Sequence, residues 1–201
     1  MLPGDMTNAT QFWGQSSICG GASSLDTATC DGDGDGLIAY TIPKPTEPGA
    51  AWKQLANAGL VEGSFDGLYP ISAALSDRAC ASTASCPTSK FPQILWTLRS
   101  GVLLGNNFFT YPEGYLNALF TGQINNGNGT AAVLTVREAW NIDTKMDDGM
   151  PAQGNIIIGQ CAINNILYCV TTLTATTAAY RLDEEFNGKG GLKNLSDTCA
   201  R

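Results

Sequence analysis

The chain has 201 residues and a formal net charge of −7, and its pI is near 4.4. Its 11 Lys and Arg residues are too few to line a phosphate-binding surface, which argues against nucleic acid as a partner. With 43% hydrophobic and 14% charged residues, the composition is typical of a loop-rich exported protein that forms a single globular domain over residues 1–201.

Seven cysteines and no histidine bear on the compartment and on metal chemistry. No CxxC pair is present, so a zinc ribbon is disfavoured, and mixed Cys/His sites are impossible. Short loops closed by disulfides are expected in an oxidising compartment. The sequence-near pairs are Cys19 with Cys30, Cys80 with Cys86, and Cys161 with Cys169, which leaves Cys199 either as a free thiol or as a partner that replaces one of these.

The first 36 residues carry turn and loop residues around Trp13, and their Asp-Gly tract is unsuited to helix or strand. An extended, glycine-rich lead-in is expected there. From Glu47 onward apolar residues recur at helical spacing, and Gly59 is placed to end a helix in a left-handed cap. This predicts a helix over 48–58, followed by a loop over 63–92.

The second half of the chain contains signals for both helices and strands. Thr135 and Glu138 form a capping box that predicts a helix start, and Gly149 is expected to end that helix. The other predicted elements are strands at 93–99 and 102–104, a short helix at 113–120, a turn at 125–129, and β-rich runs at 156–158 and 166–177. Because the strands cluster instead of alternating with helices, the predicted class is α+β with an antiparallel sheet.

The stretch CDGDGDGLI places Asp31, Asp33 and Asp35 on alternate positions, each followed by glycine. This matches the first half of an EF-hand-type calcium loop, to which a backbone carbonyl near Leu37 adds another oxygen. The glutamate expected at the twelfth position is absent, so further ligands would come from water, from Glu47 or from acids brought near by the fold. The alternative is a solvated acidic turn without an ion.

A second acidic group, Asp143, Asp147 and Asp148, follows the predicted helix that begins near Thr135. Carboxylates at a helix C-terminus oppose its dipole, which invites a compensating Lys145 or an ion. The alternative is a plain turn at Asp148 and its glycine.

Catalytic chemistry finds little support in the sequence. The absence of histidine excludes Ser-His-acid and Cys-His arrangements. Glu184 and Glu185 are adjacent acids in a polar tail, where solvated surface is the expected role. The four tryptophans would suit sugar stacking or a hydrophobic core, and they are Trp13, Trp52, Trp96 and Trp140. We therefore expect no enzyme.

Four segments, taken in order, resemble a protein family. Residues 2–14 contain LPGDM, NAT and WG, and the Gly-Asp tract follows at 31–36. Residues 51–64 contain AWKQL, AGL and EGS, and residues 142–154 contain IDTKMDDGMP and a final glycine. Together they resemble the globular part of bacterial type IV pilin-like proteins and type II secretion pseudopilins, the prepilin-type cleavage and methylation proteins.

This resemblance implies a pilin-like α+β domain that hangs from a long apolar N-terminal helix. That helix, which a prepilin peptidase trims and which packs in the filament core, is expected to be missing from this chain. The resemblance also implies a cell-envelope location, with the globular domain periplasmic or extracellular, and other pilin or pseudopilin subunits as partners. Contact with the membrane would run only through the helix, and the chain alone is expected to be monomeric.

Two functions follow from these observations. The first is a structural subunit of a type IV pilus-like or type II secretion pseudopilus filament, stabilised by calcium. The alternative is a secreted calcium-dependent binding module or pilus-tip adhesin that recognises glycans through its tryptophans.

Overall fold

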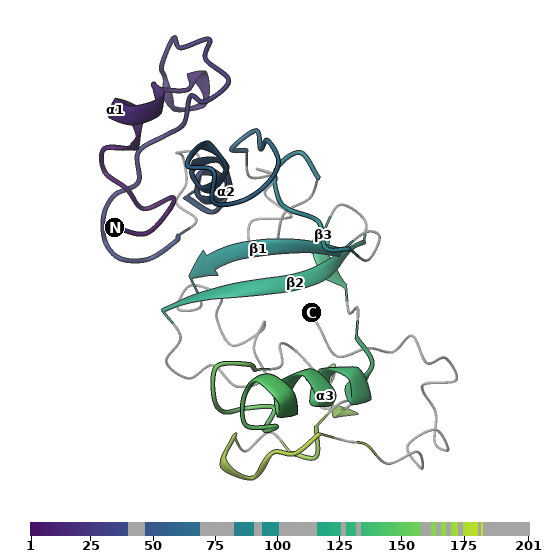
Figure 1. Ribbon diagram of the computed structural model, residues 1–201. Coiled ribbons are helices and arrows are strands. Elements are labelled where there is room, and N and C mark those ends of the chain that lie inside the picture. Colours follow the sequence, from purple (N-terminus) through teal and green to yellow (C-terminus); the bar gives the residue numbers. More distant parts are fainter. Residues whose placement is uncertain are drawn as a thin grey trace. The chain divides into compact units, whose positions relative to one another are not determined.

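The protein was analysed as a computed structural model of residues 1–201. The structure describes residues 1–39, 47–68, 83–90, 94–100, 116–125, 128–131, 134–157, 162–163, 166–167, 170–172, 175–180 and 182. The chain forms two compact units, one of residues 1–103 with 114–129 and one of residues 104–113 with 130–201. Figure 1 shows the helices and strands of both.

The lead-in contains short helices, so the expectation of a purely extended segment is wrong. Helix α1 spans Ala9–Trp13, and a 3-10 helix, η1, spans Ser17–Cys19. The carboxylate of Asp31 accepts hydrogen bonds from both the backbone N–H and the hydroxyl of Thr10, each at 2.8 Å, in the first turn of α1. A distant acid thus supplies the helix start that local propensity does not.

A disulfide joins the predicted pair Cys19 and Cys30. Cys86 is disulfide-bonded as well. The remaining predicted disulfide cysteines lie outside the described residues, and they are Cys80, Cys161, Cys169 and Cys199. Disulfides form and persist in oxidising compartments.

Helix α2 spans Glu47–Asn57, one residue earlier at each end than predicted. Gly59 has a φ of 69° and donates its N–H to the carbonyl of Ala56, which confirms the predicted left-handed cap. The helix packs on strand β1 through a core in which Trp52, Phe65, Cys86 and Leu95 are buried.

The three-stranded sheet has the order β1-β2-β3, with β1 at Ile94–Ser100, β2 at Asn117–Asn125 and β3 at Asn128–Ala131. Strands β1 and β2 are antiparallel, and Ser100 pairs with Asn117. The predicted helix at 113–120 is wrong over residues 117–120, because these residues pair antiparallel with residues 97–100 of β1 and pairing overrides weak local preference. The predicted turn at 125–129 joins two neighbouring strands, although residues 126–127 lie outside the described residues, as do 102–104.

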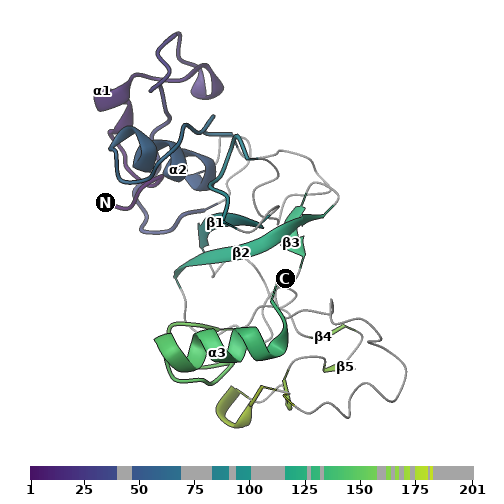
Figure 2. The ribbon, with the colours of Figure 1, turned by 45° about the vertical axis from the view of Figure 1, so that its right-hand side comes forward.

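The second unit is built around helix α3, Val136–Met146. Its capping box is present as predicted, with Thr135 and Glu138 bonding each other's backbone N–H groups. The buried cluster of this unit includes Ala139 of α3 and consists of Ala139, Val170, Ala178 and Tyr180. Figure 2 shows α3 and the two short strands of this unit, β4 and β5.

Among the described residues, the predicted β-rich runs are found in part. Residues 156–157 form no strand. Strands β4, Ala162–Ile163, and β5, Ile166–Leu167, pair as a short antiparallel ladder, and Val170 makes an antiparallel bridge with Tyr180. Residues 175–177 form a 3-10 helix, η3, where a strand was expected. Threonine-rich composition favours strands, but it also suits tight turns. Composition alone therefore did not distinguish a strand from a 3-10 helix at these residues.

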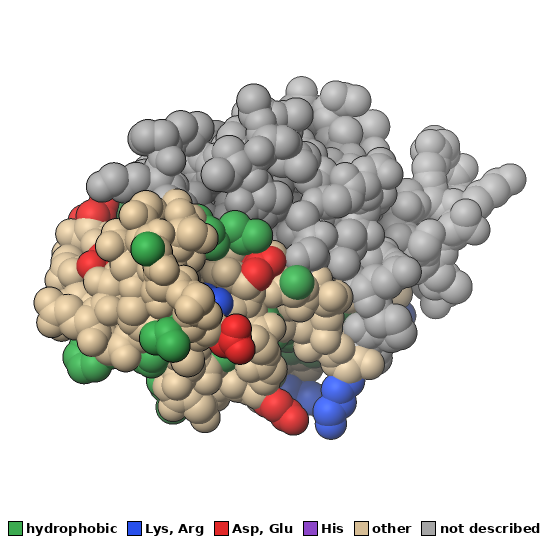
Figure 3. All heavy atoms as spheres, turned by 90° about the horizontal axis from the view of Figure 1, so that it is seen from above, with side chains coloured by type: hydrophobic (Ala, Val, Ile, Leu, Met, Phe, Trp, Pro, Cys, Tyr) green, Lys and Arg blue, Asp and Glu red, His purple; other side chains and the backbone are tan. Residues whose placement is uncertain are grey.

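The described residues therefore form a small α+β structure with antiparallel strands and a disulfide. In that part of the chain, none of the helices combines the length and the apolar character needed to span a bilayer. On the face seen in Figure 3, hydrophobic side chains of the described residues stand in separate groups among polar atoms. Scattered groups of this kind are usual on a protein surface.

Candidate metal centre

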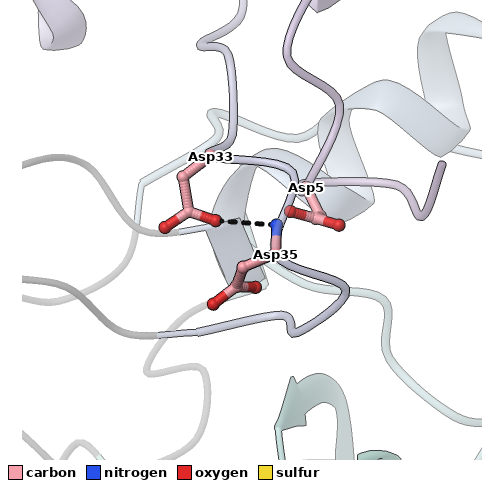
Figure 4. Close-up of side chains that lie close together, drawn as sticks. All are labelled: Asp5, Asp33 and Asp35. Carbon is pink, nitrogen blue, oxygen red and sulfur yellow. Dashed lines mark hydrogen bonds between the residues drawn. The ribbon is translucent and has the colours of Figure 1, made fainter.

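Two acidic groups each bring three carboxylates together, with oxygens within 4.8 Å of one another. The first consists of Asp5, Asp33 and Asp35, and the second of Asp143, Asp147 and Asp148. Each group could hold a metal ion, because oxygen ligands at such spacing suit hard divalent cations. Figure 4 shows the first group, in which Asp5 reaches the Asp-Gly loop from the N-terminal segment.

Asp5 organises the loop from the inside. Its side chain is 3% exposed, and its two oxygens accept the N–H groups of Gly34 at 2.7 Å and Gly36 at 3.1 Å. A carboxylate that accepts two backbone N–H groups satisfies both glycines at once, in the way that an anion is held by a backbone nest. The loop from residue 31 to 37 is therefore wrapped around a buried charge.

Glu47 supplies a second buried carboxylate from the first residue of α2. It is 5% exposed and accepts the N–H groups of Asp33 at 3.1 Å and Ala39 at 2.7 Å. Burial raises the pKa of Glu47, the two backbone hydrogen bonds lower it, and the charges of Asp33 and Asp5 raise it again, with an overall upward result. Glu47 thus belongs to the same negative region, as the sequence suggested.

The loop aspartates accept hydrogen bonds within the loop itself. Asp33 accepts the N–H of Asp35 at 3.1 Å, and Asp35 accepts the N–H of Leu37 at 2.7 Å. Every hydrogen bond described here to Asp5, Asp33, Asp35 and Glu47 comes from a backbone N–H. Amide dipoles offset only part of this negative charge, and a divalent cation would offset much more.

The structure changes the membership of the predicted calcium set. Asp33 and Asp35 are brought together, but Asp31 turns away to α1 and bonds Thr10, and Asp5 takes its place in the group. The predicted carbonyl ligand near Leu37 stays a prediction, since the contact given for Leu37 is the donation of its N–H to Asp35. No spacing rule connects residue 5 with residue 33, so Asp5 was beyond the reach of motif reasoning.

Two further side chains, each with two hydrogen bonds, fix the loop to the body of its unit. Asn117, the first residue of β2, accepts the N–H of Ile38 at 2.7 Å and donates to the carbonyl of Gly36 at 2.8 Å. Gln54 of α2 accepts the N–H of Gly4 at 2.6 Å and donates to the carbonyl of Cys30 at 3.0 Å. The loop is therefore held at its start, its end and its centre.

The second acidic group sits at the end of α3. Asp143 is fully buried and accepts the hydroxyl of Tyr180 at 2.7 Å and the N–H of Gly149 at 3.2 Å. Burial raises the pKa of Asp143 despite these two bonds. Asp147 accepts the N–H groups of Asn155 and Ile156, which lowers its pKa.

Both sequence interpretations of this second group retain support. Asp148 accepts the N–H of Met150 at 2.7 Å and Gly149 has a φ of 74°, the geometry of the predicted plain turn. Lys145 is exposed. The carboxylate grouping that would suit an ion is present in the same turn.

The tryptophans do not form one exposed stacking face. Trp52 is 7% exposed and belongs to the core under β1, with Trp96 partly buried against it. Trp140 packs against the core of the second unit, and Trp13 lies beside Phe12 on α1, with ring centroids 5.9 Å apart. Glu184 and Glu185 lie outside the described residues.

Comparison with protein-family models, with curated proteins and with solved structures found no match to this chain. The site's own geometry therefore has to support any functional proposal.

Proposed function

We propose that this chain is the globular part of a structural subunit in a type IV pilus-like or type II secretion pseudopilus filament, with its lead-in fixed by calcium. The observation that carries the proposal is that three of the four family-like segments, far apart in sequence, bond directly to one another. They are residues 2–14, 31–36 and 51–64.

The contacts between these segments are specific. Asp5 of the first segment accepts two N–H groups of the second, and Thr10 of the first donates to Asp31 of the second. Gln54 of the third accepts the N–H of Gly4. Residues that carry the resemblance are thus the ones that assemble a single lead-in structure, which is what a shared fold element requires.

The cation part of the proposal rests on the first acidic group. Asp5, Asp33 and Asp35 would supply carboxylate oxygens, and Glu47 lies next to them through the N–H of Asp33. Calcium takes 6 to 8 oxygen ligands, so water would complete the shell. With only three carboxylates we expect an affinity on the order of 10⁻⁴ to 10⁻³ M, as in extracellular modules.

In this proposal the ion has a mechanical role and no chemical one. It would cancel repulsion among carboxylates that the fold forces together and would stiffen the segment that precedes α2. A structural subunit needs this rigidity and needs no catalytic group.

Expression of the native gene in its own host tests the filament role. The protein should appear in the fraction of surface filaments released by shearing, or in crosslinks to other pseudopilins, only when prepilin peptidase is active. Loss of the peptidase should leave a larger precursor in the inner membrane. Detection of the protein in the cytosol, or unchanged release without the peptidase, would contradict the proposal.

A second candidate, a calcium-dependent glycan-binding module, has one observation in its favour. Phe12 is 66% exposed, and its ring lies tilted against the ring of Trp13. Exposed aromatic pairs offer an apolar face to sugar rings. Glycan-array binding by the wild type that is lost in Phe12→Ala would support this module, whereas no binding by either protein would leave the filament subunit.

A further inference from the structure

The chain contains five Asp-Gly dipeptides, and four of them adopt the same turn. In each of the four, Oδ1 of the aspartate accepts the backbone N–H two residues further on, at 2.7 to 3.1 Å. The glycine in each has a φ between 73° and 87°. The four dipeptides begin at Asp33, Asp35, Asp66 and Asp148.

This turn brings a reactive pair together. It folds the aspartate carboxyl back along its own backbone, toward the peptide nitrogen of the glycine. That nitrogen can attack the carboxyl carbon to close a five-membered succinimide, and glycine permits the approach because it has no Cβ. A nitrogen whose N–H is held in a hydrogen bond is restrained from this attack.

Three of the four glycine N–H groups are held by a second carboxylate. Gly34 and Gly36 both donate to Asp5, and Gly149 donates to Asp143. These bonds tie each nitrogen to an acceptor other than its own aspartate. The carboxylates of Asp5 and Asp143, which organise the two acidic groups, therefore also protect the Asp-Gly bonds of these groups from succinimide formation.

The fifth dipeptide is guarded in another way. The carboxylate of Asp31 is held by Thr10, away from the following peptide, and Gly32 donates its N–H to the carbonyl of Met6 at 2.8 Å. Both the electrophile and the nucleophile of this pair are engaged elsewhere.

The turn at Asp66 lacks this guard. Asp66 donates its own N–H to the carbonyl of Ala84, and its carboxylate accepts from Leu68 and from the Ser85 hydroxyl. Among the described residues, the Gly67 N–H donates no hydrogen bond. Asp66-Gly67 thus has the shared turn and a nucleophile that no described residue restrains.

We propose that Asp66-Gly67 is a site of spontaneous isoaspartate formation, and that Asp5 and Asp143 protect the matching bonds elsewhere. In the first step the Gly67 nitrogen bonds to Cγ of Asp66, and the N–H proton leaves with the carboxyl hydroxyl as water. Water then adds to the succinimide carbonyl that came from the Asp66 main chain and breaks its bond to nitrogen. The backbone now runs through Cγ, with no net change in mass and no oxidation or reduction.

The modification would alter how this loop meets α2. A Cβ placed on Gly49 would lie 2.7 Å from the Gly67 carbonyl oxygen, so the loop rests directly on the helix backbone. Lys53 also donates to the carbonyl of Phe65 at 3.1 Å. An isoaspartyl linkage lengthens the main chain by one methylene, which this close contact cannot absorb without displacement.

The test is an internal comparison in the wild-type protein, aged in its native state at about pH 5, near the ordinary pKa range of aspartate. Trypsin separates Asp66 from the other four dipeptides by cutting after Lys53 and Arg78, and electron-transfer fragmentation then locates isoaspartate. We expect roughly five- to tenfold more at Asp66 than at Asp33, Asp35 or Asp148, the rate factor given by a hydrogen bond of typical net strength. Even distribution among these sites, or none at Asp66, would overturn the proposal.

Two controls separate the fold from the local sequence. In the reduced, urea-unfolded chain all five bonds should age at similar rates, and continued dominance of Asp66 there would overturn the proposal. In folded Asp5→Asn, which retains only one acceptor oxygen, isoaspartate at Asp33 or Asp35 should rise toward the level at Asp66, while Asp66→Glu should remove the signal from its own peptide. If Asp5→Asn does not fold, the wild-type comparison still decides.

Discussion

Calcium should stabilise this protein through Asp5 and not through Asp31, although the sequence pattern names Asp31 as the ligand. The two aspartates make a matched pair for substitution. Asp5 lies in the first acidic group, whereas the carboxylate of Asp31 is bonded to Thr10. In Asp31→Asn the calcium response should remain, and in Asp5→Asn it should be lost.

The size of the response follows from the site. Carboxylate oxygens within 4.8 Å of one another repel by about 1 kcal/mol per pair in water-like surroundings, and an ion removes this cost. For a dissociation constant of about 1 mM, about 10 mM calcium adds roughly 1.4 kcal/mol to the free energy of unfolding. In a chain of 201 residues this raises Tm by about 3 to 6 °C.

The assay is thermal unfolding with calcium and with chelator, scored as the difference between the two Tm values for each variant. This difference is needed because Asp5→Asn also leaves one of the Gly34 and Gly36 N–H groups without its acceptor and lowers Tm in both conditions. Magnesium at the same concentration controls for general screening. A response lost in Asp31→Asn and kept in Asp5→Asn would refute the reasoning, and so would no response in the wild type.

Three more predictions follow from single contacts. Replacing Cys19 and Cys30 by Ala removes a link across a sequence separation of 11, and should lower the free energy of unfolding by about 3 kcal/mol in urea titrations. Thr135→Ala removes the N-cap of α3 and should cost about 1 kcal/mol in the same assay. Tyr180→Phe removes the hydroxyl that bonds Asp143 and should cost about 1 to 3 kcal/mol at neutral pH. Burial raises the pKa of Asp143, so the stability contributed by its protonation is present below its ordinary pKa and lost as pH rises through the raised value. Removal of the Tyr180 bond raises that pKa further, so the loss should be smaller at mildly acidic pH than at neutral pH. Equal losses at both values would contradict this account.

Local signals predicted the elements whose evidence lies within a few residues. The capping box at Thr135 and the left-handed Gly59 are read from neighbours in the sequence, and both elements were found where expected. Strand β2 was mistaken for a helix over 117–120, because its partner β1 lies about twenty residues earlier and pairing overrides weak local preference. Helix α1 was not expected, since its stabilising acid is Asp31.

The candidate site shows the same difference between local signals, which the sequence carries, and long-range contacts, which it does not. Asp33 and Asp35 share a motif and were found together, because the local turn in which Asp33 accepts the N–H of Asp35 brings them close. Asp5 joins them across 28 residues, and Asn117 fastens the loop across 79. Contacts of that span depend on the folded topology, which a single sequence does not reveal.

The hydrogen bonds of Gly4 and Asp5 also determine how the lead-in would respond to a pulling force. Gly4 donates to Gln54 while Asp5 holds two N–H groups of the Asp-Gly loop, so two consecutive residues make three long-range bonds. Tension applied at the N-terminal end would strain these bonds together instead of peeling them one at a time. Once they failed, the Cys19–Cys30 link would keep residues 20–29 from extending. A pulling experiment would then record one short, abrupt lengthening before the sheet is reached.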